Sequence, residues 1–169
     1  KRIKSPNLHR MNVIDAISTG YISSVGKYIE QFENQFEKYI GQGYAVAVSS
    51  GTAALQLALS TLNLQKDDEV ILPNFTFGGS INSIINSGAT PVLTDINLDH
   101  WTINVDEIKK KITNKTKAIM PVHIYGQPAE MDEICEIAKE NKLLIIEDCA
   151  EAIGARYKDK LIGIHGDCS

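Results

Sequence analysis

The stretch that decides the fold is residues 143–152, LLIIEDCAEA. Its first four residues form a continuous apolar run, which is typical of a parallel strand buried on both faces. Asp148 follows at the end of that run, and Glu151 comes three residues later. Because open α/β sheets bind ligands outside the carboxyl ends of their strands, we expect Asp148 to face a ligand.

Apolar runs and helical spacings alternate along the rest of the chain. Strands are predicted over residues 44–48, 69–72, 90–95, 117–124 and 143–148, and helices over 28–40, 53–62, 78–87, 105–112 and 131–138. Ile81, Ile84 and Ile85 are expected on the buried face of the third helix. Asn104 and Glu107 are expected to cap the fourth. Strands that alternate with helices indicate an α/β fold with a mostly parallel sheet and right-handed crossovers.

The composition is that of an ordinary globular protein, with 169 residues, 43% hydrophobic and 22% charged, and a net charge of −4. This charge gives no reason to expect a nucleic-acid partner, and the lysine triplet at 109–111 is expected on a solvated helix face. No apolar stretch approaches the length of a bilayer, and we expect neither a signal peptide nor a membrane partner. Three cysteines without CxxC spacing fit a reducing cytoplasm.

The chain ends are also informative at this stage. The sequence begins without Met and stops at Ser169 in the middle of a pattern, so we expect an excerpt of a longer protein. A short hairpin is predicted around Lys158 and Asp159. The last strands needed to complete a large sheet are not in the sequence.

A candidate anion site is the turn at residues 49–52, SSGT, between a predicted strand and a predicted helix. Free backbone N–H groups, hydroxyls and the helix dipole together form a cup for an anion there, and Gly51 allows close approach. An ordinary Ser/Thr helix cap explains the same residues. The Walker A lysine and the GxGxxG fingerprint are both missing, which argues against a nucleoside triphosphate or NAD but not against a phosphate.

Asp148 fits three kinds of ligand: a magnesium ion, a ribose 2′-hydroxyl or a protonated pyridine nitrogen. The structural alternative is a carboxylate that caps a helix after the strand. A metal usually gathers more carboxylates or histidines, and Asp95 and Asp99 near other predicted strand ends keep that alternative open. The missing dinucleotide fingerprint weakens the ribose interpretation.

Two other predicted strand ends carry aromatic residues and a histidine. Phe75 and Phe77 follow the second strand, where an aromatic face can stack on a flat heterocycle, although such residues more often belong to the core. His123 and Tyr125 end the fourth strand. A lone histidine in that place is more often structural than catalytic.

Together these strand ends offer an anion cup, a stacking aromatic and an acid for a ring nitrogen, which are the three handles of pyridoxal phosphate. The motifs are SSGTAAL at 49–55, PNFTF at 73–77, PVHIYG at 121–126 and EDCAEA at 147–152. With these motifs the chain resembles the DegT/StrS-type sugar-nucleotide aminotransferases from about residue 22 to residue 167. The resemblance implies a three-layer α/β domain of the aspartate-aminotransferase fold (fold type I). Residues 1–169 would be the N-terminal part of this large cofactor-binding domain.

The resemblance also implies roles by position. Gly51 and Thr52 match the family's phosphate-binding turn, and Phe77 matches the aromatic that stacks on the cofactor ring. Asp148 matches the catalytic acid that keeps the pyridine nitrogen protonated, so that the ring can accept carbanion charge. Glu151 matches a Gln or Glu at the ring hydroxyl, and a Glu there narrows the likeness toward perosamine-synthase-like members. No residue is matched to a metal.

The implied reaction moves an amino group from glutamate to a keto carbon of a nucleotide-linked sugar, in bacterial lipopolysaccharide or other surface-polysaccharide or deoxysugar biosynthesis. The family's Schiff-base lysine lies downstream of Ser169, and Lys142, Lys158 and Lys160 match no catalytic position. We therefore expect this stretch alone to be inactive.

The resemblance further implies a homodimer with residues 21–26 near the partner or the sugar nucleotide. Two alternatives stay open at this stage. One is a related sugar dehydratase with His in place of the lysine, and the other is a non-catalytic regulatory protein on the same fold.

Overall fold

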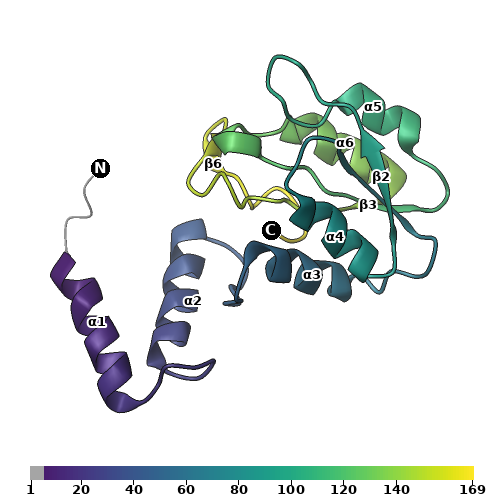
Figure 1. Ribbon diagram of the computed structural model, residues 1–169. Coiled ribbons are helices and arrows are strands. Elements are labelled where there is room, and N and C mark those ends of the chain that lie inside the picture. Colours follow the sequence, from purple (N-terminus) through teal and green to yellow (C-terminus); the bar gives the residue numbers. More distant parts are fainter. Residues whose placement is uncertain (1–5) are drawn as a thin grey trace. The chain divides into compact units, whose positions relative to one another are not determined.

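The computed structural model describes residues 6–169, with only the backbone described for residues 6–9 (Figure 1). It divides into two compact units, one ending at Ala47 and the other beginning at Val48. No helix in the described part of the chain has the length and apolar character needed to cross a membrane.

The first unit consists of two helices, α1 (Pro6–Thr19) and α2 (Lys27–Ile40). Asp15 connects them, because its carboxylate accepts from Lys27 Nζ at 2.7 Å and from the Tyr28 hydroxyl at 2.9 Å. The predicted helix over residues 28–40 is thus confirmed. It ends as expected at Gly41, which adopts a left-handed φ of 87° and donates its N–H to the Glu37 carbonyl. The helix α1 was not predicted.

The predicted strand over residues 44–48 is wrong. No ladder in the described chain includes these residues, and the Tyr44 side chain is 97% exposed. The backbone N–H groups of Ala45 and Ala47 instead donate to side-chain carboxylates of α2, those of Glu37 and Glu33. The apolar pattern of a strand was present, but the hydrogen bonds of a sheet are replaced by bonds to a helix.

The second unit contains a parallel four-stranded sheet in the order β2-β1-β3-β4. Its strands are β1 (Glu69–Pro73), β2 (Thr90–Thr94), β3 (Thr116–Ile119) and β4 (Leu144–Ile145). The chain runs from β1 outward to β2, then returns past β1 to β3 and continues to β4. The strand order therefore reverses between β1 and β3, which is where an open α/β sheet binds its ligand.

Helices cover both faces of this sheet and make three layers (Figure 1). The helices are α3 (Gly51–Thr61), α4 (Gly78–Asn86), α5 (Val105–Lys111) and α6 (Met131–Asn141). Leu59 of α3 and Ile84 of α4 share one buried cluster with Val70. Ile108 and Ile134 share the other cluster with residues of the opposite sheet face. The predicted α/β class, parallel sheet and layer count are confirmed.

Local sequence patterns predicted most of these helices and strands correctly. The Asn104 side chain accepts from the N–H groups of Asp106 and Glu107, as the predicted cap requires. A hairpin of β5 (Arg156–Tyr157) and β6 (Lys160–Leu161) forms around Lys158 and Asp159.

Two predictions of detail are wrong. The strand predicted to reach residue 124 ends at Ile119, because Pro121 has no N–H for a ladder and Tyr125 (φ 51°) lies in the 3₁₀ turn η1 (Ile124–Gly126). On α4, Ile84 is buried and Ile81 is partly buried against the same cluster, as expected, but Ile85 is exposed. The buried residues of the helix are Gly79, Ser80, Ser83 and Ile84.

Candidate functional site

A pocket of about 330 Å³ opens at the carboxyl edge of the sheet, within the second unit. The segments after β1, β3 and β4 and the first turn of α3 form its wall. Its lining residues are Ser50, Gly51, Thr52, Leu55, Phe77, Gly79, Ser80, Val122, Ile124, Asp148, Ala150 and Glu151. The volume is at the small end of the range for a small-molecule site.

The structure brings together all five residues that the sequence predicted for one site. Gly51, Thr52, Phe77, Asp148 and Glu151 come from three different segments, and all of them line this pocket. Asp95 and Asp99, the two carboxylates that kept the magnesium alternative open, do not line it. Asp95 instead accepts a hydrogen bond from Asn74 Nδ2 at 2.9 Å.

The first turn of α3 supplies hydrogen-bond donors to the pocket. The Ser50 hydroxyl caps the helix by accepting from the Ala53 N–H at 3.2 Å. The first N–H groups of a helix have no carbonyl within the helix to bond. Those of Gly51 and Thr52 are therefore left for water or a ligand, and the dipole of this 11-residue helix favours a negative charge there. The Ser50 cap is therefore present, and it leaves free the N–H groups that the predicted anion cup requires.

A second helix begins at the same place. The N-terminus of α4 has no side-chain cap, and its Gly79 lies against Thr52. A Cβ added at Gly79 would lie 2.6 Å from Thr52 Oγ1, so only glycine allows the two helix starts to approach this closely. Both helix starts therefore contribute to the lining of the pocket.

Phe77 lies on the pocket wall with 75% of its surface exposed. It is therefore not a core residue, which was the alternative interpretation of this aromatic. Phe75 is different, because its ring packs edge-on against Trp101 at a centroid distance of 5.4 Å. Phe77 alone offers a free aromatic face to a flat ring in the pocket.

Asp148 is buried in the pocket lining and forms an isolated parallel bridge with Val122. Its Oδ2 accepts from the Ser80 hydroxyl at 2.8 Å, and its Oδ1 accepts from the Ala150 N–H at 3.2 Å. No helix follows Asp148, so the helix-cap interpretation is wrong. Two donors leave lone pairs on both oxygens for a cationic or N–H group in the pocket.

Glu151 reaches the pocket from the turn after Asp148. Its Oε2 accepts from the backbone N–H of Tyr125 at 2.8 Å, which joins the segments after β3 and β4. The backbone at Tyr125 has a φ of 51°, which is uncommon for a bulky residue and is found where the surroundings impose it.

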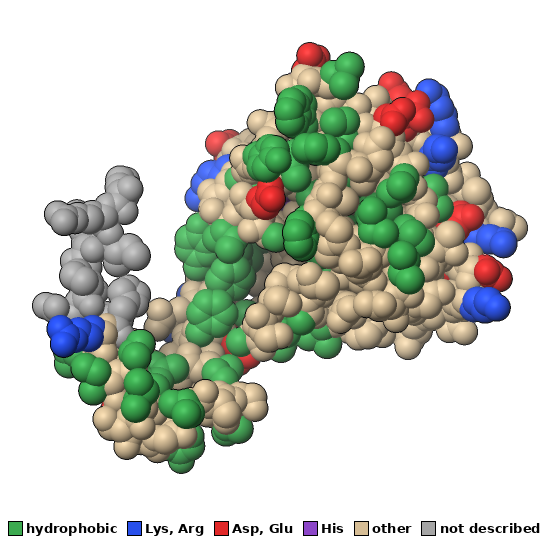
Figure 2. All heavy atoms as spheres, viewed as in Figure 1, with side chains coloured by type: hydrophobic (Ala, Val, Ile, Leu, Met, Phe, Trp, Pro, Cys, Tyr) green, Lys and Arg blue, Asp and Glu red, His purple; other side chains and the backbone are tan. Residues whose placement is uncertain are grey.

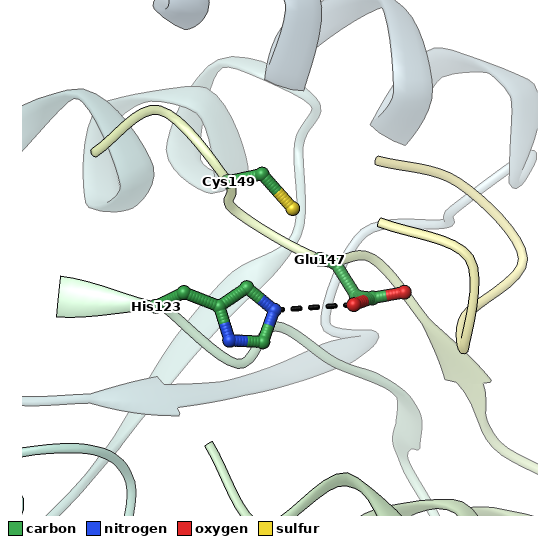
Figure 3. A group of neighbouring side chains, drawn as sticks. All are labelled: His123, Glu147 and Cys149. Atoms are coloured by element: carbon green, nitrogen blue, oxygen red, sulfur yellow. Dashed lines mark hydrogen bonds and ion pairs between the residues drawn. The ribbon is translucent and has the colours of Figure 1, made fainter. Parts of the chain in front are cut away.

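A buried polar cluster supports the pocket from behind and includes His123, Glu147 and Cys149 (Figure 3). His123 Nδ1 accepts from the Ala129 N–H at 3.1 Å, so Nε2 carries the proton and donates to Glu147 Oε2 at 3.1 Å. Both nitrogens of His123 are therefore used in the structure, and the residue is absent from the pocket lining. The structural interpretation of this histidine holds.

Glu147 receives three further hydrogen bonds. The N–H groups of Gly163, His165 and Gly166 donate to its two oxygens at 2.7 to 2.8 Å. Burial raises the pKa of this carboxyl, but the bonds from His123, Gly163 and Gly166 outweigh burial and hold it below its usual value.

Within the described residues, His123, Glu147 and Cys149 are the one set of donor atoms close enough to share a metal ion. The cluster is poorly suited to that role. Each His123 and Glu147 atom that could bind a metal already has a hydrogen-bond partner. Burial, followed by the neighbouring charges of Glu147 and Asp148, raises the pKa of the Cys149 thiol far above its usual value. A bound metal would have to break this network and deprotonate the thiol.

Ser80 is the pocket residue that the sequence did not suggest. It lies among the apolar residues of α4, where the pattern predicted a purely hydrophobic face. The available signal was the pair of hydroxyls at Ser80 and Ser83, three residues apart and so on the same helical face as Ile84. Buried hydroxyls need hydrogen-bond partners, and the fold alone determines which they are.

The fold and the pocket together define an α/β ligand-binding protein. Its site lies at the switch point of a parallel sheet and combines an anion cup, an exposed aromatic face and a buried carboxylate. The comparisons with known proteins agree with this class. Residues 6–169 match the model of the DegT/DnrJ/EryC1/StrS aminotransferase family, and the chain belongs to this family.

Individual relatives show how much of a full-length protein is present. The GDP-perosamine synthase of Escherichia coli O157:H7 is 48% identical over 93% of this chain, and the chain spans 43% of that protein. An aminotransferase from Psychrobacter cryohalolentis is 37% identical with a TM-score of 0.90, over 95% of this chain and 41% of its own. An E. coli GDP-4-keto-6-deoxy-D-mannose-3-dehydratase with bound hydrated PLP is 29% identical with a TM-score of 0.88. This match covers 97% of the present chain and 43% of the dehydratase chain.

Proposed function

We propose that the full-length protein is a pyridoxal-phosphate-dependent aminotransferase that moves an amino group from glutamate to a keto carbon of a nucleotide-linked sugar. The observation that carries this proposal is the pocket in which Asp148, Phe77 and the first turn of α3 face one another. Family membership and the 48% identity to a GDP-perosamine synthase support the substrate class.

The lining residues fit the cofactor. The N–H groups at Gly51 and Thr52 would hold its phosphate, and the exposed ring of Phe77 would stack on its flat ring. The bound cofactor supplies an electron sink for carbanion charge. Asp148 would pair with the ring nitrogen and keep its proton in place, because a buried negative charge favours the protonated nitrogen. Glu151 would contact the ring hydroxyl.

The dehydratase alternative receives less support. The perosamine synthase is 48% identical to this chain, whereas the dehydratase is 29% identical. Glu151, which matches perosamine-synthase-like members, points in the same direction. We therefore propose an amino sugar as the product, with a role in bacterial surface-polysaccharide, lipopolysaccharide or deoxysugar synthesis.

A cytoplasmic location and a homodimer complete the proposal. The three cysteines are all free thiols, which fits a reducing compartment. The large exposed apolar side chains of the first unit fit a surface that a second subunit covers.

The test replaces Asp148 by Asn in the full-length protein. The substitution keeps the shape of the side chain but removes its charge. We expect amino transfer from glutamate to a GDP-linked 4-keto sugar to fall about 30- to 150-fold, the loss expected from some 2 to 3 kcal/mol of charge stabilisation. Cofactor retention, measured by absorbance after dialysis, should change far less because the phosphate and stacking contacts remain.

Thr94→Val is a matched control, since Thr94 is a buried polar residue at the end of β2 that is absent from the pocket lining. It should retain turnover. Near-normal turnover of the Asn variant with cofactor bound would contradict the proposed role of Asp148.

A further inference from the structure

The side chain of Ser80 lies directly behind the Asp148 carboxylate. Its hydroxyl donates to Asp148 Oδ2 at 2.8 Å, and the residue is only 1% exposed. Sixty-eight residues separate the two in sequence, so this contact exists only because α4 packs beside the end of β4. Ser80 also lines the pocket.

A second hydroxyl extends the contact. Thr76 Oγ1 lies 2.8 Å from Ser80 Oγ. A hydroxyl has one proton, and that of Ser80 is used on Asp148, so Thr76 is the donor in this pair. The result is a chain of hydrogen bonds from Thr76 to Ser80 to Asp148, in which each bond polarises and strengthens the next.

This series of hydrogen bonds reaches only the Oδ2 oxygen of Asp148. The other oxygen accepts from the Ala150 N–H at 3.2 Å. A carboxylate with one donor on each oxygen cannot rotate about its last side-chain bond without breaking both contacts.

We propose that Ser80, supported by Thr76, is a positioning residue that holds the Asp148 carboxylate in one orientation toward the pocket. This inference rests on the proposed function, because it concerns how Asp148 acts on the cofactor's ring nitrogen. Glu151 is the other titratable side chain in the lining, and Glu147 and Cys149 are the sequence neighbours of Asp148. All three residues stay unchanged in the Ser80 variants, so that a change in titration can be assigned to Ser80.

The physical consequence can be stated for the ring nitrogen. If the Ser80 bond is lost, the Asp148 carboxylate can turn away from the pocket and would pair less closely with the ring nitrogen. A protonated nitrogen is less favoured when the negative charge is farther away, so we expect the titration of the bound cofactor to move to lower pH. Binding of the phosphate and stacking of the ring involve other residues and should change little.

The experiment uses the full-length protein loaded with pyridoxal phosphate and compares Ser80→Ala with wild type. Absorbance of the bound cofactor is recorded as a function of pH, and its dissociation constant is measured separately. We expect the titration of Ser80→Ala to move down by about one pH unit, the size of one hydrogen bond to a charged group. Turnover should fall about tenfold, and cofactor affinity less than about threefold.

Two further variants separate positioning from general packing. Ser80→Thr retains the hydroxyl and should titrate like wild type. Ser83→Ala removes an equally buried hydroxyl one turn along α4, whose hydrogen bonds go to the Gly79 and Thr52 carbonyls, and should leave the titration in place. If Ser80→Ala does not fold, Ser80→Cys is of similar size but a weak donor, and it should shift the titration in the same direction.

The outcomes distinguish this inference from the proposed function. A wild-type titration in Ser80→Ala, or an equal shift in Ser83→Ala, would overturn the role of Ser80 while the function stands. A wild-type protein that binds no pyridoxal phosphate, or an Asp148→Asn variant that titrates like wild type, would overturn the proposed function and this inference with it.

Discussion

At the scale of single residues, Glu151 is the most unusual member of the pocket. It brings a second carboxylate beside Asp148, although like charges in a small site oppose each other's ionisation. Among the described contacts, only its Oε2 has a protein donor, the Tyr125 N–H at 2.8 Å. We infer that its other oxygen shares a proton with the ring hydroxyl of the bound cofactor.

Glu151→Gln tests this sharing in the full-length protein. Gln keeps the hydrogen bond from Tyr125 but removes the charge that opposes ionisation of the ring hydroxyl. Turnover should stay close to wild type, while the pH dependence of the cofactor's absorbance should move to lower pH by about half a unit, a value reduced for solvent screening. Glu136→Gln, at an exposed position of α6, is the control. An unchanged titration would show that Glu151 acts only on the backbone of Tyr125.

At the scale of elements, Glu147 connects the sheet to the segment that follows the hairpin. Its oxygens accept from His123 and from three backbone N–H groups in residues 163–166. The same segment joins the sheet through the parallel bridge of Ile146 with Cys168. Glu147 therefore holds the segment beside β4 while its neighbour Asp148 faces the pocket.

Glu147→Gln should destabilise the full-length protein by about 2 to 4 kcal/mol, because a buried amide nitrogen would then point its protons at N–H donors. Urea unfolding measures the difference at neutral pH. Glu140→Gln, at an exposed position near the end of α6, should have no measurable effect and serves as the control.

The same pair of proteins gives a pH test with a definite sign. The bonds from His123 and the backbone hold the pKa of Glu147 below its usual 4.5 despite burial, so its contribution to stability is fully present above that value. It is lost as the pH falls through the lowered pKa. The stability difference between wild type and Glu147→Gln should therefore narrow in acid. A difference that stays constant down to about pH 3 would contradict a lowered pKa.

At the scale of the whole molecule, the first unit exposes an unusual amount of apolar surface (Figure 2). The largest exposed side chains in it include Met11, Val13, Ile14, Ile17, Tyr21, Ile22 and Val25. Apolar surface of this kind is usually covered in the assembled protein. A two-fold dimer is the commonest closed assembly and the one that the family resemblance implies.

We expect the full-length protein to sediment as a homodimer. Ile22→Glu, at a residue that is 74% exposed, should shift it toward monomer and lower turnover together. Leu98→Glu is the matched control, because Leu98 is 84% exposed but belongs to the second unit, and it should leave the dimer intact. A wild-type monomer that turns over at the full rate would refute the homodimer.

What the sequence determined by itself was the order of the helices and strands from α3 onward and the position of Asp148 at a strand end. Both follow from local patterns: the apolar run at 143–146, the helical spacings and the Asn104 cap each involve residues near one another in the chain. The family motifs added roles for the five pocket residues. The prediction failed at residues 44–48, where the same apolar pattern is satisfied by bonds to α2 rather than by a strand partner.

Only the tertiary structure decided which polar groups meet in the interior. Ser80 reaches Asp148 across 68 residues and His123 reaches Glu147 across 24, and no local spacing encodes either pair. A buried hydroxyl or carboxylate needs hydrogen-bond partners, but the sequence contains many polar groups that could serve as partners. The packing of α4 against the sheet selects one of them, and that selection determines which residues support the acid in the pocket.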